Sequence, residues 1–340
     1  MKRWCSGLRR IALALAVLAA AAAQAALPST FEAKARAVTQ AHAAVVGLRT
    51  VAVPDARSIE TLGSERQGSG VVIDDDGLVL TIGYLVLEAE EVDLVLADER
   101  VVPARVVAYD LASGFGLVQA LTPLGLKPAR FGHSGRLSTK EPLMIVSGGE
   151  EGDLSVARLV SRRAFSGSWE YHIEDALFTA PPRPDHSGAA LFNGDGELQG
   201  VGSLIVADAA GPGQPRRAGN MFVPIDLLKP ILGELRTQGS SRQSHRPWLG
   251  VHCIEQAGQV RVLRVSRDSP AEAAGLQPGD YIRRIDGASV GALKAFYAAL
   301  WRGNGPEREV ALEIRRDGES QTVRLRSIDR MKVLRQAQGI

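Results

Sequence analysis

One serine in the sequence stands in a setting that could support nucleophilic chemistry. Ser187 lies between a histidine and a glycine in residues 185–191 (DHSGAAL). A serine hydroxyl is a poor nucleophile near neutral pH unless a base removes its proton during attack. His186 is adjacent in sequence, and adjacent side chains diverge where the backbone is extended. Any base for Ser187 must therefore come from another segment.

Short apolar runs separated by turn residues make up most of the chain before residue 204. Examples are residues 71–73 (VVI), 78–80 (LVL), 101–107 and 143–146. Many short strands with regular turn signals predict a barrel or sandwich. The acidic run 74–77 (DDDG) is too tightly spaced for a calcium loop, so it is interpreted as a hairpin turn. Residues 239–247 are polar and basic, which indicates a linker to a further unit.

That further unit contains a motif of a helix followed by a turn. Residues 269–280 (SPAEAAGLQPGD) begin with Ser-Pro, which favours a helix start, and Gly275 can adopt a positive φ angle where the short helix ends. A turn then leads into a predicted strand over 281–285.

Two groups of motifs resemble the HtrA/Deg family of serine proteases. Residues 68–73 (GSGVVI) and 78–81 (LVLT) resemble the first barrel of these enzymes, and residues 269–280 with 285–287 (IDG) resemble their PDZ domain. The resemblance implies a mainly β chain: a trypsin-like double β-barrel followed by an α+β PDZ domain. The expected division is 1–25 signal peptide, 26–238 protease-like domain, 239–247 linker, 248–326 PDZ domain and 327–340 C-terminal tail.

The resemblance also implies that the catalytic triad is incomplete. Tyr84 in residues 81–85 (TIGYL) stands at the family's histidine position, and Gly114 in residues 110–116 (DLASGFG) stands at its acid position. Asp110 matches an earlier, non-catalytic aspartate of the family. A phenol titrates near pH ~10 and is a weak base at neutral pH. Ser187 keeps the nucleophile position.

A further departure concerns the oxyanion hole. Asp185 replaces a glycine whose backbone N–H, in the family, contributes to this site. A carboxylate there would oppose the negative charge that develops during acyl transfer. We therefore expect a protease fold that does not catalyse efficient proteolysis.

The PDZ-like unit retains more of its binding motif. The resemblance implies that residues 248–251, namely Trp248, Leu249, Gly250 and Val251, form the loop whose backbone N–H groups bind a peptide's terminal carboxylate. The peptide would add as a strand beside this segment. Leu293 and Phe296 lie on a predicted helix over 290–301, where they either line the groove or belong to the core.

The N-terminus and the composition suggest export. Four cations precede the apolar run 11–23, and residues 23–25 (AQA) fit a signal-peptidase site, although an uncleaved inner-membrane anchor is the alternative. Cleavage would take the formal net charge from +2 to about −2, which argues against nucleic-acid binding. It would also leave Cys253 as the one cysteine. A periplasmic or secreted location is expected, and neither a cofactor nor a metal site is indicated.

Three functions remain open. The first is an HtrA-like pseudoprotease that binds unfolded or C-terminal peptides of envelope proteins as an adaptor, regulator or chaperone-like scaffold. The second is an active HtrA-like serine endopeptidase that uses Ser187 with a non-standard base. The third is a structural partner, which forms a homotrimer or assembles with an active HtrA paralogue.

Overall fold

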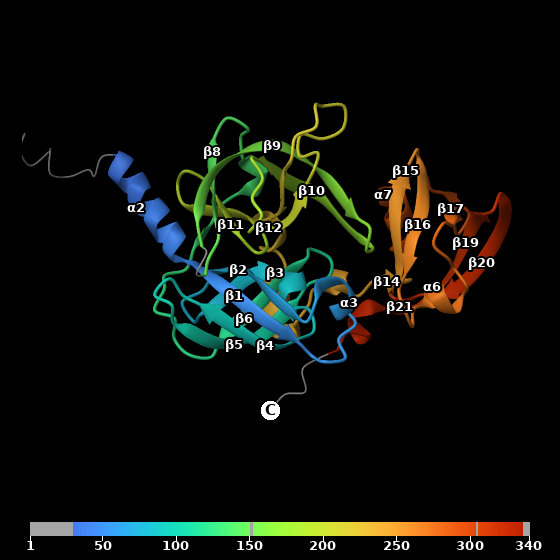
Figure 1. Cartoon of the computed structure of the whole chain (residues 1–340), viewed down its shortest axis with the longest axis horizontal. Coiled ribbons are helices and arrows are strands. Elements are labelled where there is room, and N and C mark those ends of the chain that lie inside the picture. Colours follow the sequence, from blue (N-terminus) through green and yellow to red (C-terminus); the bar gives the residue numbers. More distant parts are fainter. Residues whose placement is uncertain (1–29, 150–151, 304, 336–340) are drawn as a thin grey trace, which may run out of the picture.

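A computed structural model describes residues 30–149, 152–303 and 305–335 of the chain. The expected signal peptide, 1–25, lies outside the described residues. Figure 1 shows two β-units, one above the other, with a third, smaller unit to their right, and the mainly β prediction is confirmed. No helix among the described residues is long and apolar enough to cross a membrane.

The first unit is a closed six-stranded barrel with the strand order β1-β2-β3-β6-β5-β4. Buried apolar side chains of its strands fill its interior, and β3 is buried along its whole length. A helical turn, α4 (Gly83–Val86), follows β3 directly, and α3 (Ile59–Leu62) lies between β1 and β2. The strands are β1 (Val45–Ala52), β2 (Glu65–Val72), β3 (Leu78–Ile82), β4 (Ala89–Val95), β5 (Val101–Tyr109) and β6 (Phe115–Ala120).

The second unit is a seven-stranded sheet with the order β11-β8-β9-β10-β13-β12-β7, which closes through pairing of β11 with β12. Its longest strands form a hairpin whose end extends toward the third unit (Figure 1). The strands are β7 (Arg130–Phe131), β8 (Pro142–Val146), β9 (Leu154–Gly167), β10 (Tyr171–Ala180), β11 (Ala190–Phe192), β12 (Glu197–Val206) and β13 (Gly219–Pro224).

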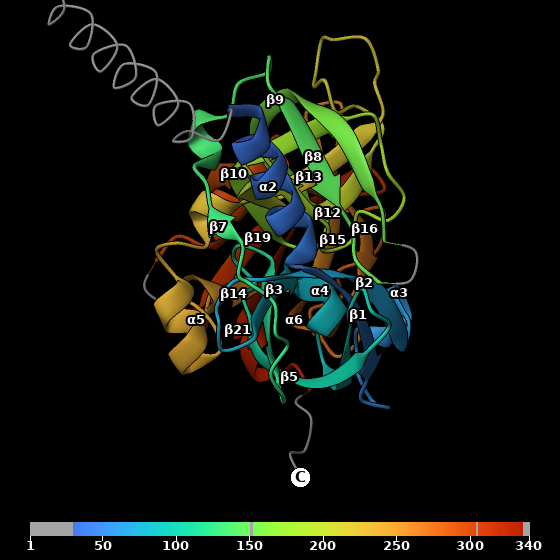
Figure 2. The same cartoon turned by 90° about the vertical axis from the view of Figure 1, so that its left-hand side faces the viewer.

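Two helices flank these barrels. Helix α2 (Thr30–Ala43) crosses the second barrel in Figure 2 and contacts the β11–β12 turn, where a Cβ at Gly196 would lie 2.4 Å from the Ala37 carbonyl oxygen. Helix α5 (Leu232–Gln238) packs on β5 after the short helix η2 (Ile225–Leu227), and η1 (Ser134–Arg136) precedes β8.

The third unit is a small sheet with the path β15-β16-β17-β19-β20, covered by α7 (Leu293–Leu300). The predicted short helix is present as α6 (Pro270–Ala273). The Ser269 side chain caps it by accepting a hydrogen bond from Glu272 N, and Gly275 has a φ of +75°. The strands are β15 (Val251–Gln256), β16 (Gln259–Val265), β17 (Tyr281–Ile285), β18 (Ala288–Ser289), β19 (Glu309–Arg316) and β20 (Glu319–Arg326).

The expected linker and tail are more ordered than their polar composition indicates. Residues 239–247 contain η3 (Arg242–Ser244), and β14 (Pro247–Trp248) pairs with β21 (Ile328–Asp329) beyond the PDZ-like unit. Ser244 in the linker and Asp329 in the tail are both buried. The short helix η4 (Arg330–Lys332) follows Asp329. The pairing of β14 with β21 holds the start of the tail against the segment that enters the PDZ-like unit.

Candidate functional site

Ser187 lies at a tight corner where the second barrel meets the first. Its carbonyl oxygen accepts a hydrogen bond from Ser69 N on β2 at 2.8 Å. The next residue, Gly188, has a φ of +73°, and a Cβ there would lie 1.9 Å from the Ser69 carbonyl oxygen. Glycine is therefore required, and the corner holds the partly exposed Ser187 at the boundary between the barrels.

The Tyr84 side chain, on α4, reaches Ser187. Its hydroxyl oxygen lies 2.8 Å from Ser187 Oγ and 2.9 Å from the Ser203 carbonyl oxygen. A carbonyl can only accept, so the single phenolic proton goes to Ser203, and the Ser187 hydroxyl donates to Tyr84. The structure thus brings together the residues at the nucleophile and base positions.

This contact does not make Tyr84 an effective base. Burial raises the pKa of Tyr84 to about 12, although the hydrogen bond with Ser187 opposes the shift. About one molecule in 10⁵ would be ionised at pH 7, and the neutral phenol oxygen accepts protons weakly. Ser187 consequently has a hydrogen-bond partner without a partner that removes its proton.

Gly114 lies next to α4, because its carbonyl oxygen accepts a hydrogen bond from Gly83 N at 2.7 Å. Its φ is +84°, and a Cβ would meet the Tyr171 hydroxyl oxygen at 3.0 Å. That hydroxyl donates to the Ser113 carbonyl oxygen at 2.6 Å. A tyrosine of β10 thus fills the space beside the acid position, where no carboxylate stands.

Asp110, in the same turn, has a structural environment. It is fully buried and accepts hydrogen bonds from Ser113 Oγ and Ser244 Oγ, both at 2.5 Å, and from Ser241 N at 3.1 Å. Burial opposes ionisation, but hydrogen bonds from the three serines lower the pKa of Asp110. The carboxylate therefore joins the first barrel to the segment before the PDZ-like unit.

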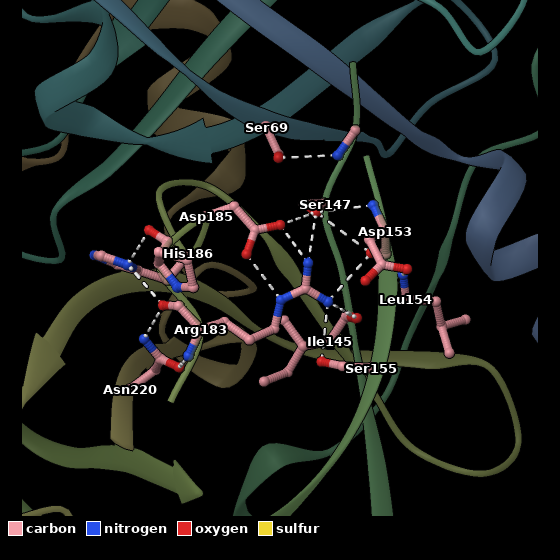
Figure 3. A network of polar contacts seen from close by, with 12 residues as sticks. Ser69, Ile145, Ser147, Asp153, Leu154, Ser155, Arg183, Asp185, His186 and Asn220 are labelled. Atoms are coloured by element: carbon pink, nitrogen blue, oxygen red, sulfur yellow. Dashed lines mark hydrogen bonds and ion pairs between the residues drawn. The ribbon is translucent and has the colours of Figure 1, made fainter. Parts of the chain in front are cut away.

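Asp185 faces a guanidinium group, which changes the expected electrostatics. Figure 3 shows Arg183 and Ser147 around its carboxylate: Arg183 Nε donates to Oδ1 at 2.9 Å, while Arg183 Nη2 and the Ser147 hydroxyl both donate to Oδ2. Burial opposes ionisation, but Arg183 and Ser147 lower the pKa of Asp185. The expectation of an unpaired charge opposing the oxyanion is corrected, because Arg183 neutralises the carboxylate.

Sequence reasoning missed Arg183. The side chain is 8% exposed and lies among strand carbonyls and hydroxyls, donating to Ser155 Oγ at 2.9 Å. Asn220 holds its backbone through two hydrogen bonds, at 2.7 and 2.9 Å (Figure 3). The signal was an arginine two residues before an aspartate in 181–185 (PPRPD), but only the fold places its partners around it.

His186 does not serve Ser187. Its Nδ1 lies 2.9 Å from the Pro184 carbonyl oxygen and 3.2 Å from the Arg183 carbonyl oxygen, so it carries a proton directed into its own turn. Among the described residues, no group of three or more His, Cys, Asp or Glu side chains is arranged to hold a metal ion.

The loop expected to bind a carboxylate has the required backbone shape. Gly250 has a φ of +85°, and a Cβ there would lie 2.3 Å from Ser269 Cβ. The N–H groups of Leu249, Gly250 and Val251 converge on one point, which the carboxylate of Glu170 occupies. Trp248 pairs with Ile328, while Leu293 and Phe296 are buried in the core of this unit.

Comparison with known families identifies both folded parts. Residues 68–201 match the trypsin-like peptidase domain, and residues 247–326 match the PDZ domain. The chain thus combines a trypsin-like peptidase fold with a C-terminal PDZ domain.

Whole-chain comparisons support a more particular assignment. The chain is 28% identical over 272 residues to a probable periplasmic serine endoprotease DegP-like of Pseudomonas fulva, which covers 76% of this chain and 55% of that protein. It is 30% identical to putative protease Do-like 14 of Arabidopsis thaliana, over 66% and 57% of the two chains. The chain spans about half the length of these curated relatives. The chain is therefore similar to DegP-like and Do-like proteases over most of its length.

Solved structures agree on the fold. The HtrA-type protease AlgW with a decapeptide superposes with a TM-score of 0.54 at 22% identity, over 87% of this chain and 98% of that chain. The serine endoprotease from Yersinia pestis gives a TM-score of 0.52 at 19% identity, over 89% and 99%.

Proposed function

We propose that this protein is a non-catalytic HtrA-like protein of the cell envelope that binds peptides or protein C-termini through its PDZ domain. It would act there as an adaptor, a regulator or a chaperone-like scaffold. The observation that carries the proposal is the hydrogen bond from Ser187 to a neutral, partly buried phenol, beside an acid position filled by glycine. The envelope location is supported by the names of the periplasmic relatives.

Loss of the triad base and acid has a large expected effect. In serine proteases, removal of triad members costs on the order of 10⁴ to 10⁶ in turnover. Pairing of Asp185 with Arg183 removes one electrostatic obstacle but supplies no base. The arrangement therefore supports recognition of polypeptides rather than their hydrolysis.

The second candidate is an active endopeptidase that uses Ser187 with a non-standard base. It is favoured by the relatives, which are named serine endoproteases, and by the retained Ser187 at the nucleophile corner. Association as a homotrimer or with an active paralogue is compatible with either function, and α2 is a candidate contact surface.

A labelling experiment separates the two candidates. The chain lacking residues 1–25 is treated with a fluorophosphonate probe and, separately, with unfolded casein, beside Ser187→Ala and with trypsin as the reagent control. We expect no Ser187-dependent labelling and no casein cleavage. Labelling that disappears in Ser187→Ala, together with cleavage of casein, would establish the endopeptidase instead.

A further inference from the structure

The carboxylate-binding loop of the PDZ domain already holds a carboxylate from the same chain. Glu170 Oε1 accepts hydrogen bonds from Gly250 N at 2.7 Å, Val251 N at 3.0 Å and Leu249 N at 3.2 Å. Glu170 belongs to the turn between β9 and β10, about 80 residues earlier in the sequence. Three successive N–H groups directed at one oxygen are the arrangement that captures a peptide's terminal carboxylate.

The backbone beside Glu170 also contacts both elements that flank the carboxylate-binding loop. The Ser168 carbonyl oxygen accepts a hydrogen bond from Cys253 N on β15 at 2.9 Å. On the other side, the Tyr297 hydroxyl of α7 donates to the Gly167 carbonyl oxygen at 2.6 Å. The hairpin end, which reaches the third unit in Figure 1, therefore contacts both β15 and α7, the two walls between which a PDZ ligand adds as a strand.

Burial and charge make this an extensive contact. Glu170 is 2% exposed and adopts a φ of +58°. Arg246 Nη2 donates to the Glu170 carbonyl oxygen at 3.3 Å, and Lys294 on α7 pairs with Glu174 on β10 at 2.8 Å. The contact thus combines backbone, carboxylate and side-chain interactions on both walls of the groove.

We propose that the β9–β10 hairpin end, Gly167–Tyr171, is an internal ligand of the PDZ groove, with the Glu170 carboxylate in the place of a peptide's C-terminus. A free C-terminal peptide then binds only by displacing the hairpin. The inference rests on the proposed peptide-binding function and adds a regulatory property: the groove is closed until a competitor of sufficient affinity or concentration is present.

The expected size of the effect follows from competition within one chain. A tethered ligand acts at an effective concentration in the millimolar range, and the apparent affinity for a free peptide falls by the fraction of open molecules. If about nine molecules in ten are closed, removal of the internal ligand strengthens peptide binding about tenfold.

The test measures peptide binding to the full chain lacking residues 1–25. The probes are fluorescein-labelled decapeptides that end in Val, Leu, Ile or Phe with a free carboxylate, and the same peptides as C-terminal amides. We expect Glu170→Ala to bind the free-acid peptides about tenfold more tightly than wild type. Asp175→Ala, which removes an exposed carboxylate from the same hairpin, should bind as wild type does.

A second variant acts from the opposite wall. Tyr297→Phe keeps the buried ring but removes the hydroxyl that holds the Gly167 carbonyl oxygen, so it should also strengthen peptide binding. Equal, measurable affinities of wild type, Glu170→Ala and Tyr297→Phe would overturn the internal-ligand assignment while leaving the proposed function intact.

Amide hydrogen exchange keeps the two hypotheses distinguishable. If no variant binds any peptide, the proposed peptide-binding function fails. Exchange at the Leu249, Gly250 and Val251 amides then decides whether Glu170 holds the loop: faster exchange in Glu170→Ala than in wild type supports the internal contact, and unchanged protection rejects it.

Discussion

At the scale of single residues, the site is defined by the oxygen that accepts the hydrogen bond of the Ser187 hydroxyl. The sequence predicts a phenol at the base position, but it does not reveal the Ser203 carbonyl oxygen that takes the phenol's own proton. That second contact orients Tyr84 as an acceptor toward Ser187. Tyr84, which the resemblance places at the base position, thus joins Ser187 and Ser203 in a chain of hydrogen bonds across the barrel boundary.

The Gly114 position gives a prediction that separates backbone strain from crowding. Gly114→Ala forces a Cβ into a φ of +84° and to 3.0 Å from the Tyr171 hydroxyl, whereas at Gly125, with a φ of +71°, a Cβ would have no heavy atom within 4 Å. We expect Gly125→Ala to lower the free energy of unfolding by about 1 kcal/mol and Gly114→Ala by about 2 kcal/mol or more.

Urea unfolding of the two variants beside wild type measures these differences. Equal losses of unfolding free energy in Gly114→Ala and Gly125→Ala would show that the Tyr171 side chain moves aside without destabilising the protein. In that case the space beside the acid position would be less restricted than the geometry indicates.

At the scale of elements, the Asp110 carboxylate connects the turn before β6 to η3. Because hydrogen bonds lower its pKa in the folded protein, its contribution to stability is present above its ordinary pKa and is lost as the pH falls through the lowered folded value. Asp110→Asn should lower the free energy of unfolding by about 2 to 3 kcal/mol at pH 7.

The pH dependence of unfolding tests this assignment. The stability difference between wild type and Asp110→Asn should shrink as the pH falls below about 4, where the carboxylate protonates in the unfolded chain. The matched control is Asp175→Asn, an exposed carboxylate. A stability difference between wild type and Asp110→Asn that stays constant with pH would mean that the negative charge of Asp110 does not contribute to holding η3.

Elements with local signals were predictable, and contacts between distant segments were not. The short strands and the Ser-Pro start of α6 follow from neighbouring residues, whereas the carboxylate loop with Gly250 follows from the resemblance to HtrA-type PDZ domains. Arg183 within the second barrel and Glu170 in the PDZ loop depend on partners far away in sequence, so composition gives no indication of them. The buried Asp329 was missed because the pairing of β14 with β21 joins segments about 80 residues apart.

At the scale of the whole molecule, closure of the groove should take up a proton. Burial raises the pKa of Glu170 to about 7, against the hydrogen bonds from Val251, Leu249 and Gly250 that lower it. The closed form is then favoured most below Glu170's ordinary pKa of 4.5 and loses this advantage as the pH rises through 7. Peptide affinity of wild type should therefore rise between pH 5 and pH 8, by up to about 10- to 100-fold.

Fluorescence polarisation with wild type and Glu170→Ala over this range tests the prediction. The charged and titratable groups facing Glu170 are Arg246 and Arg330, the Cys253 thiol and the Tyr297 phenol; burial raises the pKa of the thiol and of the phenol, so both stay neutral over this range. Glu170→Ala should have a flatter profile. The same rise with pH in both proteins would assign the titration to another group.

The paired strands β14 and β21 limit how far the PDZ domain can move away from the two barrels. The segment that enters the domain and the segment that leaves it are paired through β14 and β21. Ser241 and Ser244 of the entering segment donate hydrogen bonds to Asp110, and Arg335 N of the leaving segment donates one to Glu88. Two adjacent attachments permit rotation about their common axis but oppose separation. A displaced hairpin would thus remain beside its groove, and each departure of a bound peptide would be followed by rapid intramolecular recapture.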